Sequence, residues 1–185
     1  MSHDTRFEEL IARGMAASAD LDADHAIACF TCAAGIDPAS GIPHFLIGAE
    51  LAGRGDLMGA EHAFAQAVSL APAFHLARYQ LGLLQFSCER SAVALATWEP
   101  LLDLPADDPL GHFVRGFRAL STGGIAQALQ HLRHGLGLSP GNPALSADIA
   151  KIIQTVERLR DRQAQPHAAD PMAVYLVNGS TRRLQ

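Results

Sequence analysis

The feature of this sequence that most constrains its fold is a spacing of 34 residues, which recurs along most of the 185-residue chain. Four glycines and four alanines each follow this period, and a large apolar residue stands four positions after each alanine. These residues are Gly14, Gly48, Gly82 and Gly116; Ala26, Ala60, Ala94 and Ala128; and Phe30, Phe64, Trp98 and Leu132. Such a period is typical of a solenoid, in which each unit buries its apolar face against the next.

Within this period the pattern L-G-x2-Y…A-x3-F…P resembles the tetratricopeptide repeat (TPR), a pair of antiparallel helices. The second unit, GIPHFLIGAELAGRGDLMGAEHAFAQAVSLAPAF, is the clearest copy, and Pro38, Pro72 and Pro140 close three of the units. The resemblance covers four units, residues 7–40, 41–74, 75–108 and 109–142. It implies an all-α fold, a right-handed superhelical array of four TPR helix pairs with a C-terminal capping helix.

Three further segments surround the repeats. Residues 1–6 are expected to form a short N-terminal extension. Residues 143–163 predict an amphipathic helix that caps the last unit, because an array needs a polar outer face. Its apolar stripe consists of Leu145, Ile149, Ile152, Val156 and Leu159. Residues 164–185, which contain the apolar run MAVYLV, predict either a flexible terminus or a segment that docks in an apolar groove.

Local signals predict where several helices begin and end. Asp56 is placed to cap one helix, and Asp108 and Asn142, each followed by a proline, are placed to cap two others. Pro100 interrupts the second helix of the third unit, so this helix is expected to kink or end near Trp98.

The TPR resemblance also implies a binding groove. In such proteins the first helix of each unit lines the concave surface, and positions 2, 5, 9 and 12 of the unit point into it. The mostly apolar residues assigned in this way are Ile11, Met15, Ile42, Phe45, Ala49, Leu76, Tyr79, Leu83, Phe86, Leu110, Phe113, Phe117 and Leu120. The same positions also hold Glu8, Ser18 and Ala52. The alternative is that these side chains are ordinary core residues buried between helices.

An exposed apolar strip of this size is an aggregation hazard unless something covers it. The sequence therefore predicts a protein–protein interaction module that binds an apolar or amphipathic segment of a partner. The basic residues with which some TPR proteins grip a C-terminal carboxylate are missing, whereas the apolar groove resembles that of small bacterial TPR secretion chaperones. The competing prediction is a self-associating scaffold whose groove holds its own or a neighbour's C-terminal tail.

Composition excludes other classes of function. With 14 Lys and Arg against 19 Asp and Glu, the formal charge of -5 argues against a nucleic-acid or anionic-membrane binder. The N-terminus lacks the pattern of a secretory signal, and no apolar run is long enough to span a membrane, so a cytoplasmic location is expected. The three cysteines are compatible with a reducing compartment.

No chemical motif predicts an enzyme, a cofactor or a metal site. Cys29 and Cys32 form a CxxC with His25 one turn earlier, but this motif falls in the middle of a predicted helix and lacks a fourth ligand. The glycine-rich stretch AGRGDLMG follows no strand and lacks the lysine of a phosphate-binding loop.

Overall fold

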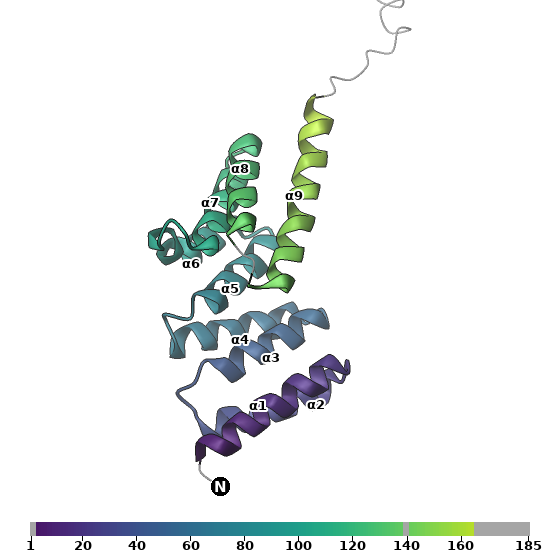
Figure 1. The fold of residues 1–185 in the computed structure, drawn as a ribbon, viewed down its shortest axis with the longest axis vertical. Coiled ribbons are helices and arrows are strands. Elements are labelled where there is room, and N and C mark those ends of the chain that lie inside the picture. Colours follow the sequence, from purple (N-terminus) through teal and green to yellow (C-terminus); the bar gives the residue numbers. More distant parts are fainter. Residues whose placement is uncertain (1–2, 139–140, 165–185) are drawn as a thin grey trace, which may run out of the picture. The chain divides into compact units, whose positions relative to one another are not determined.

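The computed structural model describes residues 3–138 and 141–164, and every regular element in these ranges is a helix. The all-α prediction is therefore confirmed. The elements, labelled in Figure 1 except for the short 3₁₀ helix η1, are α1 (His3–Ala19), α2 (Ala23–Ile36), α3 (Ile42–Gly53), α4 (Leu57–Leu70), α5 (His75–Ser87), α6 (Ser91–Trp98), η1 (Glu99–Asp103), α7 (Pro109–Ser121), α8 (Ile125–Gly137) and α9 (Pro143–Ala164). Helix α1 starts within residues 1–6, and the predicted tail lies outside the described residues beyond Ala164.

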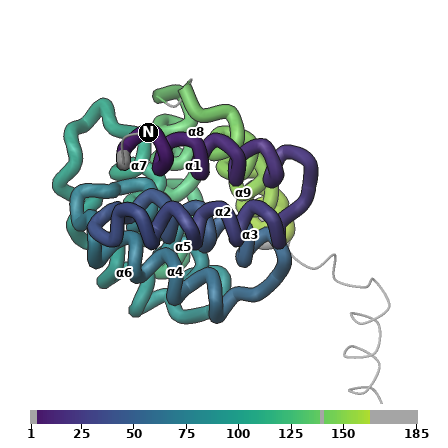
Figure 2. Tube along the Cα trace, turned by 90° about the horizontal axis from the view of Figure 1, so that it is seen from below, coloured from purple at the N-terminus to yellow at the C-terminus, as the bar shows by residue number. Residues whose placement is uncertain are grey.

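The chain forms two compact units, Met1–Val114 and Arg115–Gln185, whose boundary falls inside α7. In the first unit each helix from α1 to α6 packs against the next one in sequence. Figures 1 and 2 both show α1 running alongside α2. Since their connection is short, the two helices are antiparallel, as a TPR pair requires.

The repeated glycines mark the closest approach of the two helices in each pair. A Cβ atom added to Gly48 of α3 would lie 2.7 Å from ring atoms of Phe64 in α4, too close for any real contact. A Cβ on Gly82 of α5 would collide with the indole of Trp98 in α6. The equivalent pairs are Gly14 with Phe30 in the compact unit Met1–Val114 and Gly116 with Leu132 in the compact unit Arg115–Gln185. The 34-residue period therefore reflects a repeated close contact, here called the glycine seam, in which a large side chain of the second helix packs over a glycine of the first.

The predicted helix caps are present. The Asp56 carboxylate accepts a hydrogen bond of 2.9 Å from the Gly59 backbone N–H at the start of α4. Asp108 accepts one of 2.8 Å from Leu110 N–H, and Asn142 accepts one of 3.1 Å from Leu145 N–H. Each side chain satisfies a backbone donor that has no partner inside its helix.

Pro100 acts as expected. Helix α6 ends at Trp98, and the chain continues as the 3₁₀ helix η1, which contains the proline near its start. The third helix pair thus has a second helix of 8 residues, against 14 in α4 of the preceding pair.

In the second unit α9 packs against α8. Leu145, Ile149, Ile153 and Val156 are buried, and an ion pair of 2.5 Å joins Arg133 of α8 to Glu157 of α9. The predicted stripe is largely right, but Ile153 is the more buried member of the Ile152–Ile153 pair, and Leu159 is 46% exposed.

Candidate peptide-binding pocket

An apolar pocket of about 430 Å³ lies within the first unit, among α3, α4 and α5. This volume is in the range of about 300 to 1,000 Å³ that is usual for ligand sites. Most lining residues are apolar, with two polar side chains from α5. They are Phe45, Ala49 and Ala52 of α3; Leu57 and Phe64 of α4; and Gln80, Leu83, Leu84 and Ser87 of α5.

The spacing of residues in α3 explains why the pocket is there. Phe45, Ala49 and Ala52 are four and three residues apart, so they share one face of the helix. Two of the three are alanines, whose small side chains leave space that a leucine would fill. The Phe45 ring is fixed by neighbouring rings, with centroid distances of 5.8 Å to Phe64 and 4.9 Å to Phe74. The pocket therefore has a rigid aromatic wall beside an open floor.

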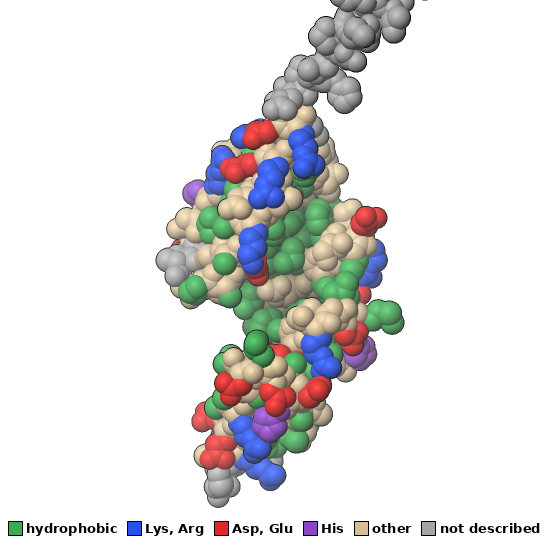
Figure 3. Space-filling model, turned by 90° about the vertical axis from the view of Figure 1, so that its right-hand side faces the viewer, with side chains coloured by type: hydrophobic (Ala, Val, Ile, Leu, Met, Phe, Trp, Pro, Cys, Tyr) green, Lys and Arg blue, Asp and Glu red, His purple; other side chains and the backbone are tan. Residues whose placement is uncertain are grey.

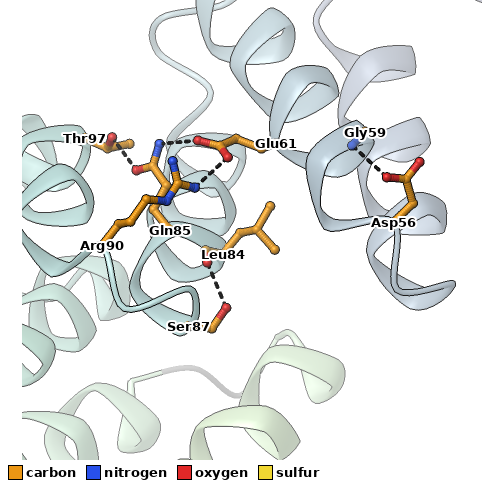
Figure 4. Close-up of polar contacts among 8 residues, drawn as sticks. All are labelled: Asp56, Gly59, Glu61, Leu84, Gln85, Ser87, Arg90 and Thr97. Atoms are coloured by element: carbon orange, nitrogen blue, oxygen red, sulfur yellow. Dashed lines mark hydrogen bonds and ion pairs between the residues drawn. The ribbon is translucent and has the colours of Figure 1, made fainter.

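A polar network ties α4, α5 and α6 together in the same unit (Figure 4). The Glu61 carboxylate pairs with the Arg90 guanidinium at 2.5 Å and accepts a hydrogen bond of 3.2 Å from the Gln85 amide. The Gln85 carbonyl in turn accepts one of 2.7 Å from the Thr97 hydroxyl. The hydrogen bond from Arg90 lowers the pKa of Glu61 from its ordinary value of 4.5, and Glu61 raises the pKa of Arg90. This network fixes the position of α5, which supplies four of the lining residues.

The predicted groove residues fall into three groups. The exposed ones are Met15, Ile42 and Ala49. The half-buried ones are Ile11, Phe45, Leu76, Leu83, Phe86 and Leu120. The buried ones are Tyr79, Leu110, Phe113 and Phe117.

The buried residues differ from the open groove that the sequence predicts. The Tyr79 ring lies 6.1 Å from that of Trp98 and 6.0 Å from that of Phe113, measured between centroids, and none of the three is accessible to solvent. Their aromatic bulk is used in packing between neighbouring helices, as in the alternative that treats these positions as core. These residues do not line the pocket.

Of the predicted groove residues, the pocket brings together Phe45, Ala49 and Leu83. Ala52 occupies a predicted groove position as well. Leu57 comes from the second helix of its pair, and no rule about the first helices could have found it. Leu84 and Phe64 belong to the packing between helices and contribute only part of their surface to the pocket.

The two cysteines of the CxxC motif in α2 differ in exposure. Cys29 is buried and Cys32 is exposed, so the two thiols face different surroundings. The His25 Nε2 atom lies 3.6 Å from the Cys29 sulfur and accepts a hydrogen bond of 3.2 Å from Arg13. Within the described ranges, no group of three or more His, Cys, Asp or Glu residues could hold a metal ion.

Among the helices that the structure describes, none has both the length and the apolar character needed to cross a membrane.

No protein-family model matches the chain, and no curated protein matches it. Several solved structures are similar to the chain. A chain of the APC/C hetero-tetramer Cut9–Hcn1 matches with a TM-score of 0.71 and 20% identity over 82% of this chain and 30% of that one. PilF of Pseudomonas aeruginosa matches with a TM-score of 0.64 and 17% identity, over 87% of this chain and 74% of that one.

YrrB, described as a TPR protein with an unusual peptide-binding site, has a TM-score of 0.57 and 18% identity over 85% of this chain and 84% of that one. The chain therefore has the TPR fold, as the repeat predicts.

Proposed function

We propose that this chain is a cytoplasmic protein–protein interaction module that binds an apolar or amphipathic segment of a partner in the pocket of α3, α4 and α5. The observation that carries the proposal is the pocket itself, which has a mostly apolar lining and an accessible floor at Ala49. The fold is shared with YrrB, whose description includes a peptide-binding site. A chaperone-like role is one form of this function, since a bound apolar segment is kept from aggregating.

The affinity would come from burying aliphatic side chains of the partner against Phe45, Ala49 and Leu83. Each fully buried large side chain contributes about 1.5–3 kcal/mol before the costs of association are subtracted. Two or three such side chains would contribute about 3–9 kcal/mol before those costs.

The second candidate function is a scaffold that associates with itself through the C-terminal tail. It is favoured by the run MAVYLV at residues 172–177, which is as apolar as a partner segment would need to be. Light scattering on the full chain and on a chain ending at Gln163 distinguishes the two functions. Loss of oligomers on truncation supports the scaffold, whereas an unchanged monomer with unchanged peptide binding supports the partner module.

The proposed function is tested by blocking the floor of the pocket. Ala49→Arg places a long charged side chain in the pocket, and Ala65→Arg makes the same change at an exposed position of α4 that does not line it. Binding of a fluorescent leucine-rich amphipathic peptide to the full chain is measured by anisotropy. We expect Ala49→Arg to weaken binding at least about tenfold, with Ala65→Arg close to the unchanged chain. Equal binding by both variants would contradict the pocket as the site.

A further inference from the structure

The two compact units carry opposite charge. Residues 1–114 contain 5 arginines against 15 Asp and Glu, a formal charge of -10, whereas residues 115–185 contain 9 Lys and Arg against 4 Asp and Glu, a formal charge of +5. The modest total of -5 hides this difference. The candidate pocket lies entirely in the acidic unit, since its lining runs from Phe45 to Ser87.

Charges of both signs lie within two residues of the pocket lining in sequence, and the carboxylates of Asp56 and Glu89 are among them. Asp56 directly precedes the lining residue Leu57, and Glu89 follows the lining residue Ser87 by two positions. Both side chains are exposed. Asp56 uses one oxygen to cap α4 (Figure 4), which leaves it an anion at the surface.

Two of the three neighbouring arginines form ion pairs with carboxylates, and the third, Arg78, donates hydrogen bonds of 3.5 Å and 3.3 Å to the backbone carbonyls of Thr97 and Pro72. Arg54 forms an ion pair of 2.5 Å with Asp24, and Arg90 forms one of 2.5 Å with Glu61. Because the guanidinium groups of Arg54 and Arg90 are each paired with a carboxylate, these two arginines add little net positive charge beside Asp56 and Glu89. An incoming acidic segment would meet like charge here, and an incoming basic segment would meet opposite charge.

From these charges we infer that the partner of the pocket is a basic amphipathic segment, whose apolar side chains enter the pocket while flanking Lys or Arg side chains lie near Asp56 and Glu89. This inference rests on the proposed function and narrows the class of partner. Figure 3 shows one face of the molecule, on which hydrophobic side chains lie among charged ones. The remaining carboxylates of the unit add a longer-range attraction that speeds encounter at low salt.

The experiment compares three synthetic peptides of about 18 residues on the full chain, with leucines at the i, i+3, i+4 and i+7 spacing of a helix anchor. The other positions hold Lys in the first peptide, Gln in the second and Glu in the third. We expect the Lys peptide to bind roughly tenfold more tightly than the Gln peptide at an ionic strength of about 0.05 M, and to lose most of this advantage at about 0.5 M. The Glu peptide should bind most weakly.

Two variants locate the effect. The double variant Asp56→Asn with Glu89→Gln removes both charges while asparagine keeps the helix cap, and it should reduce the advantage of the Lys peptide about fivefold. The matched control, Glu99→Gln with Asp107→Asn, removes two exposed charges of the same unit that do not flank the pocket, and it should leave most of the advantage intact.

The possible outcomes separate the inference from the proposed function. If the Gln and Glu peptides bind as tightly as the Lys peptide, and Ala49→Arg still blocks them, the pocket binds apolar segments but the inferred basic character is wrong. If the Lys peptide binds equally to the Ala49→Arg and Ala65→Arg variants, it binds the acidic surface in general, and the inference fails. If none of the peptides binds, the proposed function itself is contradicted.

Discussion

Within the compact unit Met1–Val114, the same repeat position has two different environments. Phe45 and Phe113 are both position 5 of their repeat units, two periods of 34 residues apart. Phe45 is half-buried and lines an open pocket, whereas Phe113 is completely buried beside Tyr79. The difference teaches that the repeat position determines where a side chain points, while the neighbouring helices decide whether it remains accessible.

The largest expected effect comes from truncating the two rings. Phe113→Ala should destabilise the protein by about 3–5 kcal/mol, because it leaves a cavity in a closed aromatic cluster. Phe45→Ala should destabilise it by roughly 1–2 kcal/mol, since part of the ring is already in contact with solvent. Urea unfolding followed by circular dichroism measures both. Equal losses of unfolding free energy in the two variants would show that Phe45 and Phe113 are packed alike, which would contradict the difference described above.

The glycine seam gives the next largest effect. Gly82→Ala forces a methyl group into the Trp98 ring and should destabilise the protein by about 1–3 kcal/mol. Gly53→Ala is the matched control, because a Cβ there meets nothing within 4 Å, and it should be neutral or slightly stabilising. Thermal melts of both variants test this. A Gly82→Ala protein that melts no lower than the Gly53→Ala protein would mean that the seam is not closely packed.

The cap of α4 should contribute less. Asp56→Ala removes the hydrogen bond to Gly59 N–H and should cost about 1 kcal/mol, whereas Asp56→Asn should retain most of the stability because asparagine caps nearly as well. Denaturant midpoints compare the two variants. Identical midpoints for alanine and asparagine would show that the cap does not stabilise the helix beside the pocket.

The smallest effect concerns the Glu61–Arg90 pair. Since the pKa of Glu61 is lowered in the folded protein, the unfolded state binds more protons, and stability from this pair is present above pH 4.5 and declines as the pH falls through the folded pKa. The gap in the free energy of unfolding between the unchanged chain and Glu61→Gln should therefore narrow as the pH is lowered from 6 to 3, values that lie roughly either side of an ordinary glutamate pKa. A gap that is constant or widens over this range would contradict the stated shift.

Much of the fold was predictable because its signals are local or periodic. The glycine and aromatic positions, the caps at Asp56, Asp108 and Asn142, and the end of α6 before Pro100 each depend on contacts within one repeat unit. Such contacts recur in every copy, so a single sequence reveals them.

The site was less predictable because it depends on what the neighbouring units contribute. The spacing in α3 places Phe45, Ala49 and Ala52 on one face, but the pocket beside them is also lined by Phe64 of α4 and Leu83 of α5, which the spacing of α3 does not specify. Tyr79 occupies the same repeat position as Phe45 but is fully buried beside the Trp98 and Phe113 rings, whereas Phe45 keeps part of its surface in the pocket. Repeat position alone therefore identified the face of the helix and overestimated how much of that face is open.

The central claim is that the pocket of α3, α4 and α5 receives a basic amphipathic segment. The most direct measurement is a titration of the full ¹⁵N-labelled chain with the Leu–Lys peptide, followed by backbone amide chemical shifts. We expect the largest shifts at the amides of Ala49, Ala52 and Leu83, with that of Glu89 also affected, and we expect these shifts to be lost in the Ala49→Arg variant. Shifts that cluster on other helices while these amides stay unchanged would contradict it.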